Sequence, residues 1–318
     1  MQSIKINENV EVRIDTYLSN VLDFSRSKIV KLIKNNIIKV NGENTKNSYL
    51  LKEGDLIEIL DYKEDNNDIL PEEMDLDIKY EDDDVIVVNK ANGVVVHPAV
   101  GNTHNTLVNG LMHYSKNLSD VNGEFRPGIV HRIDAYTTGL LMVAKNNRAH
   151  EALAASLSLN KTKRKYIALV WGVINEDTAT IDAPIGRDPK DRKKMAVVSM
   201  NSKRAVTHLK VLERYKEATL VELTLETGRT HQIRVHMNYI NHPVVNDPVY
   251  GRRKIIDSTG QCLHAYQLGF IHPTTHAYLE FQSDLPECFI NIQSKFKKEY
   301  NYSRRYRADL SVYVSKWI

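Results

Sequence analysis

The sequence predicts an α+β protein, in which a large domain has a mixed, largely antiparallel sheet with flanking helices and a small α/β module precedes it. Segments with strand character outnumber those with helix character, and consecutive strands are often close enough to form hairpins. This spacing disfavours a doubly wound parallel sheet, whose strands need long crossovers. An acidic, proline-containing stretch separates the module from the rest of the chain.

Residues 61–75 are the best candidate for a linker, because the stretch DYKEDNNDILPEEMD is acidic and has few apolar residues. The expected organisation is therefore a module at residues 1–60, this linker, a large domain at residues 76–300 and a tail at residues 301–318. The tail is basic and aromatic and matches no motif, so no role is assigned to it.

The N-terminal module contains an amphipathic helix in the stretch SRSKIVKLIKNN, with Ser25 as its candidate N-cap. Five apolar side chains share one arc of this helix: Ile29, Val30, Leu32, Ile33 and Ile37. The opposite arc carries Lys28, Lys31 and Lys34. A purely basic face suits contact with phosphates, although a solvated lysine stripe is the commoner alternative. Beyond the helix, IIKVNGENT and DLIEIL have strand character, with an Asn-Gly turn in the first.

The large domain starts near residue 76 with two extended segments, LDIKY and VIVVN, and GVVVHP at residues 93–98 is expected to be a third. The apolar run at residues 140–144 is expected to be a buried strand. The stretches KYIALVWG, AVTHLKVLE and ATLVELTLET have the composition of three further strands. Helices are expected at residues 148–158 and, after Gly228, in RTHQIRVHMNYI.

The composition limits the class of protein. Hydrophobic residues make up 42% of the 318 residues, enough for a sizeable core, which excludes global disorder. The two cysteines, Cys262 and Cys288, form no CxxC pair, so we expect neither a disulfide framework nor structural zinc, in keeping with a reducing cytosol. The N-terminus lacks a signal-peptide core, and no apolar run reaches the roughly 18 residues of a membrane span. We therefore expect a cytoplasmic protein that has no membrane partner.

The net charge of +3 hides a strong separation of charge along the chain. Residues 53–84 contain fifteen acidic side chains and two basic ones, so the rest of the chain carries a net charge of +16. Such a basic surface suits a polyanionic partner such as a nucleic acid. A solubilising surface with one acidic linker explains the same charges equally well.

Several signatures of cofactor and hydrolase chemistry are missing. The sequence has neither the GxxxxGK[ST] nor the GxGxxG pattern of nucleotide sites, and it lacks the GxSxG elbow of many hydrolases. No histidine pair has the HExxH arrangement, and His231 and His236 are five residues apart, which directs them away from each other on a helix. We therefore expect no metal and no cofactor.

Three charged segments are the candidates for a functional site: His131-Arg132-Ile133-Asp134, Lys163-Arg164-Lys165-Tyr166, and the stretch TGRTHQIR at residues 227–234. The first directly precedes the buried strand at residues 140–144 and combines a base, a cation and a carboxylate. Taken singly, each segment has a structural explanation, such as a salt bridge in a turn, an aromatic residue in a strand or an arginine at a helix surface.

Taken together, these segments resemble the ribosomal large-subunit type of RNA pseudouridine synthase. HRID followed by TTGLL is similar to the family's HRLD-x-x-T-S-G-L motif, and ETGRTHQIRVH is similar to its third motif nearly letter for letter. Lys90 with GVVVHP, the strand KYIALVWG and the stretch LHAYQLGFIHP resemble its other motifs, in family order over residues 85–273. The N-terminal module resembles the small RNA-binding domain of a small-subunit ribosomal protein, tyrosyl-tRNA synthetase and many of these synthases.

The chain departs from the family pattern at a few positions. Thr138 stands where serine is usual and keeps the hydroxyl, while Ala135 and Tyr136 replace a commonly charged pair. Ala91 stands where a proline is usual. None of these changes removes the carboxylate of Asp134.

The resemblance implies that the protein converts specific uridines to pseudouridine in structured RNA. The reaction breaks a carbon–nitrogen glycosidic bond, turns the ring and forms a carbon–carbon bond to the same sugar, which needs no nucleotide, metal or redox cofactor. By resemblance Asp134 is the essential carboxylate, acting as nucleophile or base. Arg234 would hold it ionised through two parallel hydrogen bonds, and Tyr166 would stack on the displaced base.

The resemblance and the basic helix also imply a set of residues that bind the RNA substrate: His131, Arg132, Thr138, Arg229, His231, Gln232, Lys28, Lys31 and Lys34. Ribosomal RNA of the large subunit is favoured over transfer RNA because of the attached module, and we expect a monomer. A non-catalytic RNA-binding or ribosome-assembly factor with the same fold is the main alternative, and an aspartate-dependent hydrolase is a distant third.

Overall fold

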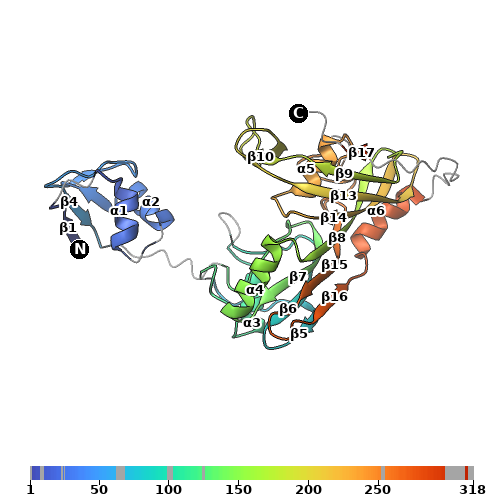
Figure 1. The fold of residues 1–318 in the computed structure, drawn as a ribbon, viewed down its shortest axis with the longest axis horizontal. Helices are drawn as coiled ribbons and strands as arrows, with labels where there is room; N and C mark the ends of the chain where they lie inside the picture. Colours follow the sequence, from blue (N-terminus) through green and yellow to red (C-terminus); the bar gives the residue numbers. More distant parts are fainter. Residues whose placement is uncertain are drawn as a thin grey trace. The chain divides into compact units, whose positions relative to one another are not determined.

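The structure is a computed structural model of the chain. It describes residues 2–7, 11–22, 24, 26–61, 69–98, 103–123, 126–251, 255–297 and 312–313. The chain divides into two compact units, Met1–Asn67 and Asp68–Ile318 (Figure 1). The expected fold class is confirmed, since helices and mostly antiparallel sheets are mixed in both units.

The N-terminal unit packs two helices, α1 (Ile14–Val21) and α2 (Arg26–Lys34), on a small antiparallel sheet. Its four strands lie in the order β1-β4-β2-β3: β1 Gln2–Lys5, β4 Leu56–Ile59, β2 Ile38–Val40 and β3 Glu43–Asn44. Asp15 connects the helices, because its buried carboxylate accepts hydrogen bonds from Arg13 and Arg26. The Arg13 guanidinium, together with that of Arg26, lowers the pKa of Asp15 to about 2.

Helix α2 has the two faces that its sequence predicts. Ile29, Leu32 and Ile33 are buried in the core of the unit, whereas Lys31 and Lys34 are exposed. Lys28 lies with its Nζ 3.9 Å from the centre of the Phe24 ring, a cation–π contact that holds it beside the helix. Two details differ from expectation: Val30 is only partly buried and lies outside that core, and the predicted cap Ser25 is outside the described residues.

The second unit is built on a ten-stranded sheet in the order β17-β9-β13-β14-β8-β15-β7-β6-β5, with β16 paired to β15. Two of its pairings, β15 with β7 and β17 with β9, are parallel, and the other pairings among its described strands are antiparallel. The strands are β5 Asp77–Glu81, β6 Val85–Lys90, β7 Thr138–Ala144, β8 Lys163–Trp171, β9 Thr178–Asp182, β13 Val206–Arg214, β14 Ala218–Leu225, β15 Leu263–Ile271, β16 Tyr278–Gln282 and β17 Val312–Tyr313.

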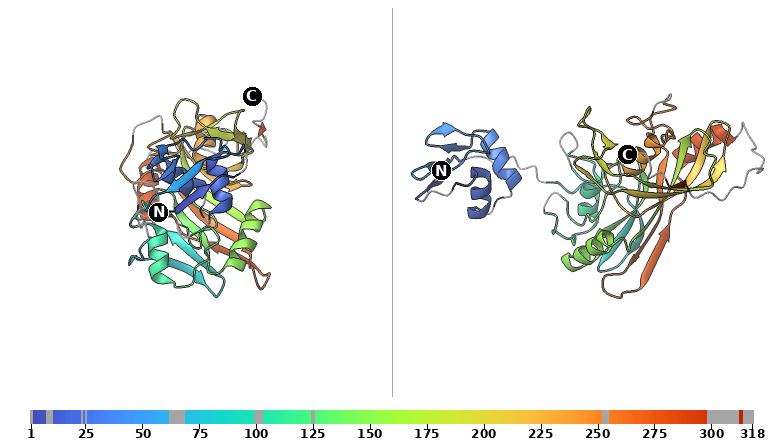
Figure 2. Two further views of the ribbon diagram at one scale, coloured as in Figure 1. Left: turned by 90° about the vertical axis from the view of Figure 1, so that its left-hand side faces the viewer. Right: turned by 45° about the horizontal axis from the view of Figure 1, so that its top comes forward.

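Helices cover both faces of this sheet (Figures 1 and 2). On one face, α3 (Leu107–Tyr114) and α5 (Gln232–Tyr239) share a core with alternate residues of β6, β7, β8 and β14. On the other face, α4 (Asn147–Ser158) packs on β6 and β7, and α6 (Glu287–Lys297) packs on β8 and β14. Because strand residues alternate between faces, the continuous apolar runs of β7 and β8 supply both cores.

Helix α5 is also covered on its far side by a three-stranded sheet: β10 Ile185–Arg187, β11 Met195–Val197 and β12 Ser202–Lys203. Val235 of the helix packs there with Ile185, while Ile233 and Met237 face the main core. The helix is therefore held from two sides, so the direction of every side chain on it is fixed by packing.

One sequence-based expectation fails in the segment before α3. The prediction of an extended segment at residues 93–98 is wrong, because they form a loop in which the carbonyls of Val95 and Val96 accept the N–H groups of Leu107 and Val108. The carbonyls of this β-branched run therefore satisfy N–H groups in the first turn of α3 instead of pairing in a sheet, and α3 itself was not expected from the sequence.

The expected linker covers residues that pack on the second unit. Residues 62–68 lie outside the described part of the chain, but Ile69 is buried in the core of that unit. Asn109 donates a side-chain hydrogen bond of 2.8 Å to the carbonyl of Leu70, and the N–H of Glu72 donates to the carbonyl of Asn109. A few apolar residues thus anchor a segment whose composition is mainly acidic. Of the tail, only Val312–Tyr313 lies within the described residues, paired with β9.

Gly139 allows β7 to lie directly beside β15. Its φ is 111°, in the region that favours glycine, and a Cβ there would lie 2.3 Å from the carbonyl oxygen of Ala265. The two residues are register partners in the parallel pairing of β7 with β15. Since β7 begins four residues after Asp134, this close approach also fixes the end of the loop that carries Asp134.

We predict that Gly139→Ala lowers the free energy of unfolding by about 3 kcal/mol or more, because it combines an unfavourable φ with a backbone clash. Gly123→Ala is the matched control, since Gly123 has a φ of 74° but nothing within 4 Å of its added Cβ. That variant should lose only about 1–2 kcal/mol. Denaturant unfolding followed by circular dichroism measures both, and equal losses would show that the contact with Ala265 relaxes freely.

Candidate active site

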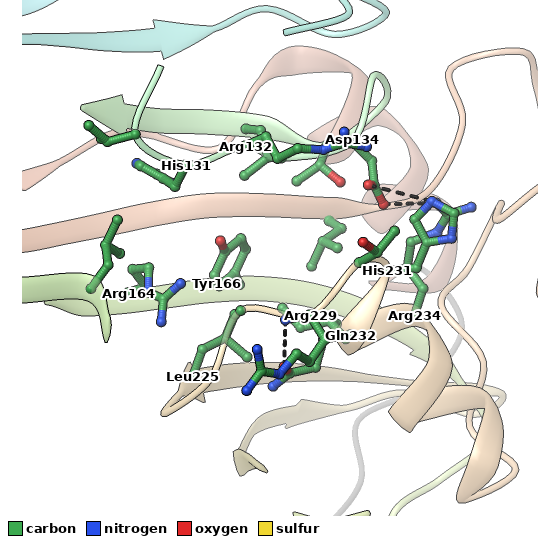
Figure 3. Close-up of a pocket in the computed structure, with 18 of the residues that line it drawn as sticks. His131, Arg132, Asp134, Arg164, Tyr166, Leu225, Arg229, His231, Gln232 and Arg234 are labelled. Atoms are coloured by element: carbon green, nitrogen blue, oxygen red, sulfur yellow. Dashed lines mark hydrogen bonds and ion pairs between the residues drawn. The ribbon is translucent and has the colours of Figure 1, made fainter. Parts of the chain in front are cut away.

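A cavity of about 380 Å³ opens on the face of the sheet that α5 covers. Its polar lining comes mainly from three separate parts of the chain: the loop with Arg132 and Asp134, strand β8 with Tyr166, and the segment that leads into α5 with Arg234 (Figure 3). These are the three segments that the sequence singles out as candidates. The fold brings them together because β8 lies at the centre of the sheet, with β14 directly beside it and β7 one strand further on, beyond β15. Residues of α4, β14 and β15 complete the lining: Leu157, Ser158, Leu225 and Leu263.

Backbone contacts fix the loop that carries Asp134. Its carbonyl accepts the N–H of Thr137 at 3.0 Å, which closes a tight turn just before β7. On the far side of the loop, Lys90 donates from Nζ to the carbonyls of Ala135, Ala91 and Val94 at 2.7–2.8 Å. One buried ammonium therefore connects the Asp134 loop to the loop after β6.

Lys90 is 2% exposed, and the described residues place no carboxylate within ion-pair distance of it. Burial lowers the pKa of Lys90 to about 7, and the charge of Asp134 acts in the opposite direction. Three carbonyl acceptors also favour the ammonium form, because a neutral amine has only two N–H groups to donate. Lys90 thus positions the loop and adds positive potential beneath Asp134.

Arg234 is shared between two carboxylates. Its Nη1 donates to Asp134 Oδ2 at 2.8 Å, while Nε and Nη2 donate to the two oxygens of Asp247 at 2.7 and 2.9 Å. The expected two parallel hydrogen bonds are therefore present, but they go to Asp247 and not to Asp134. Burial disfavours the charge of Arg234, yet the hydrogen bonds to Asp247 and the charges of both carboxylates raise its pKa above the ordinary value.

Asp247 is a site residue that the sequence did not reveal. It is fully buried, and Oδ1 also accepts the N–H groups of Val249 and Tyr250 at 2.8 and 3.0 Å. Burial disfavours its charge, but the bond to Arg234 and these N–H groups lower its pKa below the ordinary value. The sequence offers one signal that could have indicated it: an acidic residue in the stretch NDPVYG, soon after a predicted helix that contains an arginine.

His231 stands at the opposite oxygen of Asp134. Its Nε2 lies 3.7 Å from Asp134 Oδ1, and its Nδ1 is 2.9 Å from the hydroxyl of Tyr250. The residue precedes α5 with a left-handed φ of 56°, which directs the ring into the cavity. Burial lowers the pKa of His231, and the charge of Asp134 opposes that shift. The Tyr250 ring also lies 5.1 Å from the Arg234 guanidinium.

Tyr166 forms the wall of the cavity on β8 and is 7% exposed. Burial raises the pKa of its hydroxyl, Asp134 adds to the shift and Arg164 opposes it. The phenol is therefore neutral near pH 7, and no hydrogen bond within the described residues occupies its oxygen. A flat, neutral ring with an available hydroxyl suits an aromatic base in the cavity.

Some of the remaining residues that were expected to bind substrate have partners within the protein, and others carry an accessible charge. His131 and Gln232 line the cavity but have structural partners: His131 Nε2 accepts the N–H of Met142 at 3.2 Å, and Gln232 bonds to Thr227, Arg229, Val206 and Thr207. Burial, aided by Arg164, lowers the pKa of His131 to about 3, so this ring is neutral. Thr138 does not line the cavity, because its hydroxyl pairs with His264 Nδ1 at 2.8 Å behind the loop.

Arg132 and Arg229 are the cavity residues with the most accessible charge. Arg132 is exposed at the rim, with Nη1 3.5 Å from His97 Nε2, and it also borders a second recess of about 280 Å³ on the other side of the Asp134 loop. Arg229 donates from Nε to the carbonyl of Arg204 at 2.9 Å. The lysines of α2 belong to the other unit, so the structure does not relate them to this cavity.

Within the part of the chain that is described, no cluster of three or more His, Cys, Asp and Glu side chains could hold a metal ion. None of the described helices combines the length and the apolar character needed to cross a membrane. The ionisable and aromatic groups that line the cavity include the carboxylate of Asp134, its neighbours Arg234 and His231, and the ring of Tyr166.

Comparisons with known proteins agree with this arrangement. Residues 84–239 match the family model described as RNA pseudouridylate synthase, and residues 12–57 match the S4 domain. A relative named uncharacterized RNA pseudouridine synthase YlyB, from Bacillus subtilis, is 52% identical over 292 residues, or 92% of this chain and 96% of the relative. A ribosomal large subunit pseudouridine synthase D of Neisseria meningitidis is 43% identical over 300 residues, or 90% of this chain and 79% of the relative.

A solved structure supports the same assignment. The structure titled human RNA pseudouridylate synthase domain containing 1 matches with a TM-score of 0.55 at 25% identity, over 72% of this chain and 97% of that chain. The family model, the long relatives and the fold all agree with the motifs around Asp134 and Arg234. This chain therefore belongs to the RNA pseudouridine synthase family, with an S4 domain in its N-terminal unit.

Proposed function

We propose that this chain converts uridines to pseudouridine in large-subunit ribosomal RNA and that Asp134 is the reacting carboxylate. The observation that carries the role of Asp134 is its place in the cavity: one carboxylate, held by a buried arginine, opposite a tyrosine ring. The ribosomal substrate rests on relatives named ribosomal large subunit pseudouridine synthase D, such as the one in Neisseria meningitidis. Nothing in the cavity or the comparisons favours the non-catalytic alternative or the hydrolase.

Each group has a definite part in the proposed reaction. The uridine leaves its stack, at an energetic cost of a few kcal/mol, and its base lies against the Tyr166 ring. Asp134, whose Oδ2 accepts a hydrogen bond from Arg234, then acts on the nucleoside as the glycosidic bond breaks. The walls of the cavity keep the detached uracil in place while it turns, so that a ring carbon bonds to the same sugar. In this step the ring carbon gives up its proton and the ring nitrogen that left the sugar takes one up, so the product is an isomer of the substrate.

Asp247 acts as a positioning residue for Arg234 in this proposal. By binding Nε and Nη2, it leaves only Nη1 to face Asp134, so the guanidinium cannot rotate toward other acceptors. The neutral hydroxyl of Tyr166 is available to donate to a uracil oxygen or to move a proton. Arg132 at the rim would contact the displaced RNA backbone.

The two units would divide the work of substrate recognition. We infer that the N-terminal module, with Lys28, Lys31 and Lys34, binds RNA phosphates through the S4 domain, while the large domain carries the reaction. We also propose that the protein acts as a monomer. A ribosomal RNA substrate supports a cytoplasmic location.

Mapping pseudouridines in the ribosomal RNA of cells with and without this protein tests the proposal directly. Without the protein, one or a few modified sites of the large subunit should be lost.

Asp134→Asn should abolish pseudouridine formation while RNA affinity changes only by a few-fold. The amide keeps the shape and can still accept from Arg234, but it cannot act as nucleophile or base. Single-turnover assays with purified protein measure the rate, and Asp120→Asn, an exposed carboxylate outside the cavity, serves as the control. Substantial product from the Asp134 variant would refute the catalytic assignment.

Asp247→Asn should lower the saturated rate by about tenfold to a hundredfold with little change in RNA affinity. The amide cannot hold both Nε and Nη2 of Arg234, so the guanidinium moves away from Asp134. The assay is run at a temperature where circular dichroism shows the variant to be folded, because a broken buried ion pair also destabilises the protein. Asp257→Asn is the control, since Asp257 accepts hydrogen bonds from Asn246 and Thr259. An unchanged saturated rate would mean that Arg234 keeps its position without Asp247.

Replacing Lys28, Lys31 and Lys34 with alanine should weaken RNA binding without changing the saturated rate. For every phosphate that the variant no longer neutralises, the log–log salt slope of binding should fall by roughly 0.7–0.9. The control replaces three other exposed lysines of the same unit, Lys5, Lys46 and Lys52, and removes the same charge. If both triple variants change the slope equally, the α2 face has no specific role in binding.

A further inference from the structure

One buried cation in the cavity has no role in the reaction described above. Arg164 lies on β8, two residues before Tyr166, so both side chains extend from the same face of the strand. The residue is only 8% exposed. Within the described residues its guanidinium makes no hydrogen bond and no ion pair, and its Nε is buried without a partner. Figure 3 shows it beyond Tyr166, away from Asp134.

A largely buried guanidinium whose Nε has no partner among the described residues is unfavourable in the free protein. It has five N–H donors, and a buried charge without hydrogen bonds or a counter-ion destabilises the fold. Burial accordingly lowers the pKa of Arg164 below its ordinary value. Its neighbour His131 offers no compensation, because that ring is neutral and accepts a backbone N–H at Nε2. A side chain kept in such an environment indicates a ligand that completes it.

The backbone around Arg164 is shaped to admit its head group. A Cβ on Gly228 would lie 2.6 Å from Arg164 Nη1, so a larger residue at position 228 would displace the guanidinium. Gly228 lies in the segment between β14 and α5, which also carries Arg229. The glycine therefore leaves room for the arginine at the end of the cavity.

The charge at this end of the cavity favours an anion. Arg164 and Arg229 both line it, and the contacts described for Arg229 are to backbone groups and Gln232. Asp134 is the only acidic side chain among the lining residues, and Arg234 already binds it. Two guanidinium groups thus face the same end of a cavity that offers them no carboxylate.

We propose that this end of the cavity binds one phosphate group of the RNA backbone next to the target uridine, with Arg164 as the principal ligand and Arg229 as the second. Adjacent same-face positions on a strand are roughly 7 Å apart, so the site lies within the reach of one nucleotide whose base rests on Tyr166. A guanidinium fork donates two parallel hydrogen bonds to phosphate oxygens. This inference rests on the proposed function, because it takes Tyr166 as the place of the base.

The test begins with Arg164→Met, which keeps most of the length of the side chain and removes its charge. The stability of the free protein, measured by denaturant unfolding, should be unchanged or higher, because an unpartnered buried charge is removed. Affinity for a short RNA that carries the mapped uridine should fall about tenfold or more, and the salt slope should fall by roughly 0.7–0.9. Arg148→Met is the control, since Arg148 is 71% exposed and pairs with Asp84 outside the cavity.

A second arm identifies the phosphate as the ligand. The RNA is made with a neutral methylphosphonate linkage at either phosphate next to the uridine, and binding is measured with Asp134→Asn protein so that no turnover occurs. One of the two linkages should weaken binding about tenfold or more, and it should have no further effect once Arg164→Met is also present. If the neutral linkage weakens binding as much in the Arg164→Met protein as in the protein that keeps Arg164, the proposal is overturned.

Two other results would also overturn it. A slower saturated rate with unchanged affinity would show that Arg164 acts on the uracil ring, and reduced stability with unchanged affinity would show a structural role. The binding arms do not depend on the reaction. If the wild-type protein forms no pseudouridine, the proposed function fails, whereas the salt slope on a large-subunit RNA fragment still shows whether Arg164 contacts a phosphate.

Discussion

The site depends on one guanidinium that two carboxylates share. Asp247, fully buried, binds two nitrogens of Arg234, and the third nitrogen is thereby aimed at Asp134. A buried arginine needs such neutralisation, and a buried aspartate needs the arginine and the backbone N–H groups that it accepts. Because each charge compensates the next, the orientation of the Asp134 carboxylate is set by the ion pair between Arg234 and Asp247. Helix α5, packed on both sides, gives this chain of charges a rigid support.

The loop that carries Asp134 is held by contacts to its backbone as well as by its own side chains. Lys90 binds the carbonyls of two loops at once, and Gly139 lets β7 approach β15 more closely than any other residue would allow. Both residues are buried and neither lines the open cavity. Their part is to fix the position of one carboxylate, which is what a reaction on a detached base requires.

Stability and function oppose each other at Arg164. The residues around Asp134 satisfy one another in the free protein, whereas the guanidinium of Arg164 lacks partners among the described residues. A ligand phosphate would supply the missing acceptors, so the unfavourable burial in the free state becomes binding energy in the complex. In this respect the two ends of the cavity differ: the charged groups around Asp134 are paired with one another, whereas Arg164 Nε has no partner among the described residues.

The sequence by itself determined the fold class, most strands and the three segments that meet at the cavity, because alternation, turn residues and motif spacing are local properties. It also led to Asp134, Tyr166 and Arg234, whose placement in one cavity the structure shows. Only the tertiary structure decided that Asp247 binds Arg234, and that the side chains of Thr138 and Gln232 form hydrogen bonds within the protein. The physical reason is that the partner of a buried charge or polar group can lie far away in the sequence. The partner depends on which atoms the folded sheet brings within hydrogen-bonding distance, and neighbouring letters in a motif do not encode those partners.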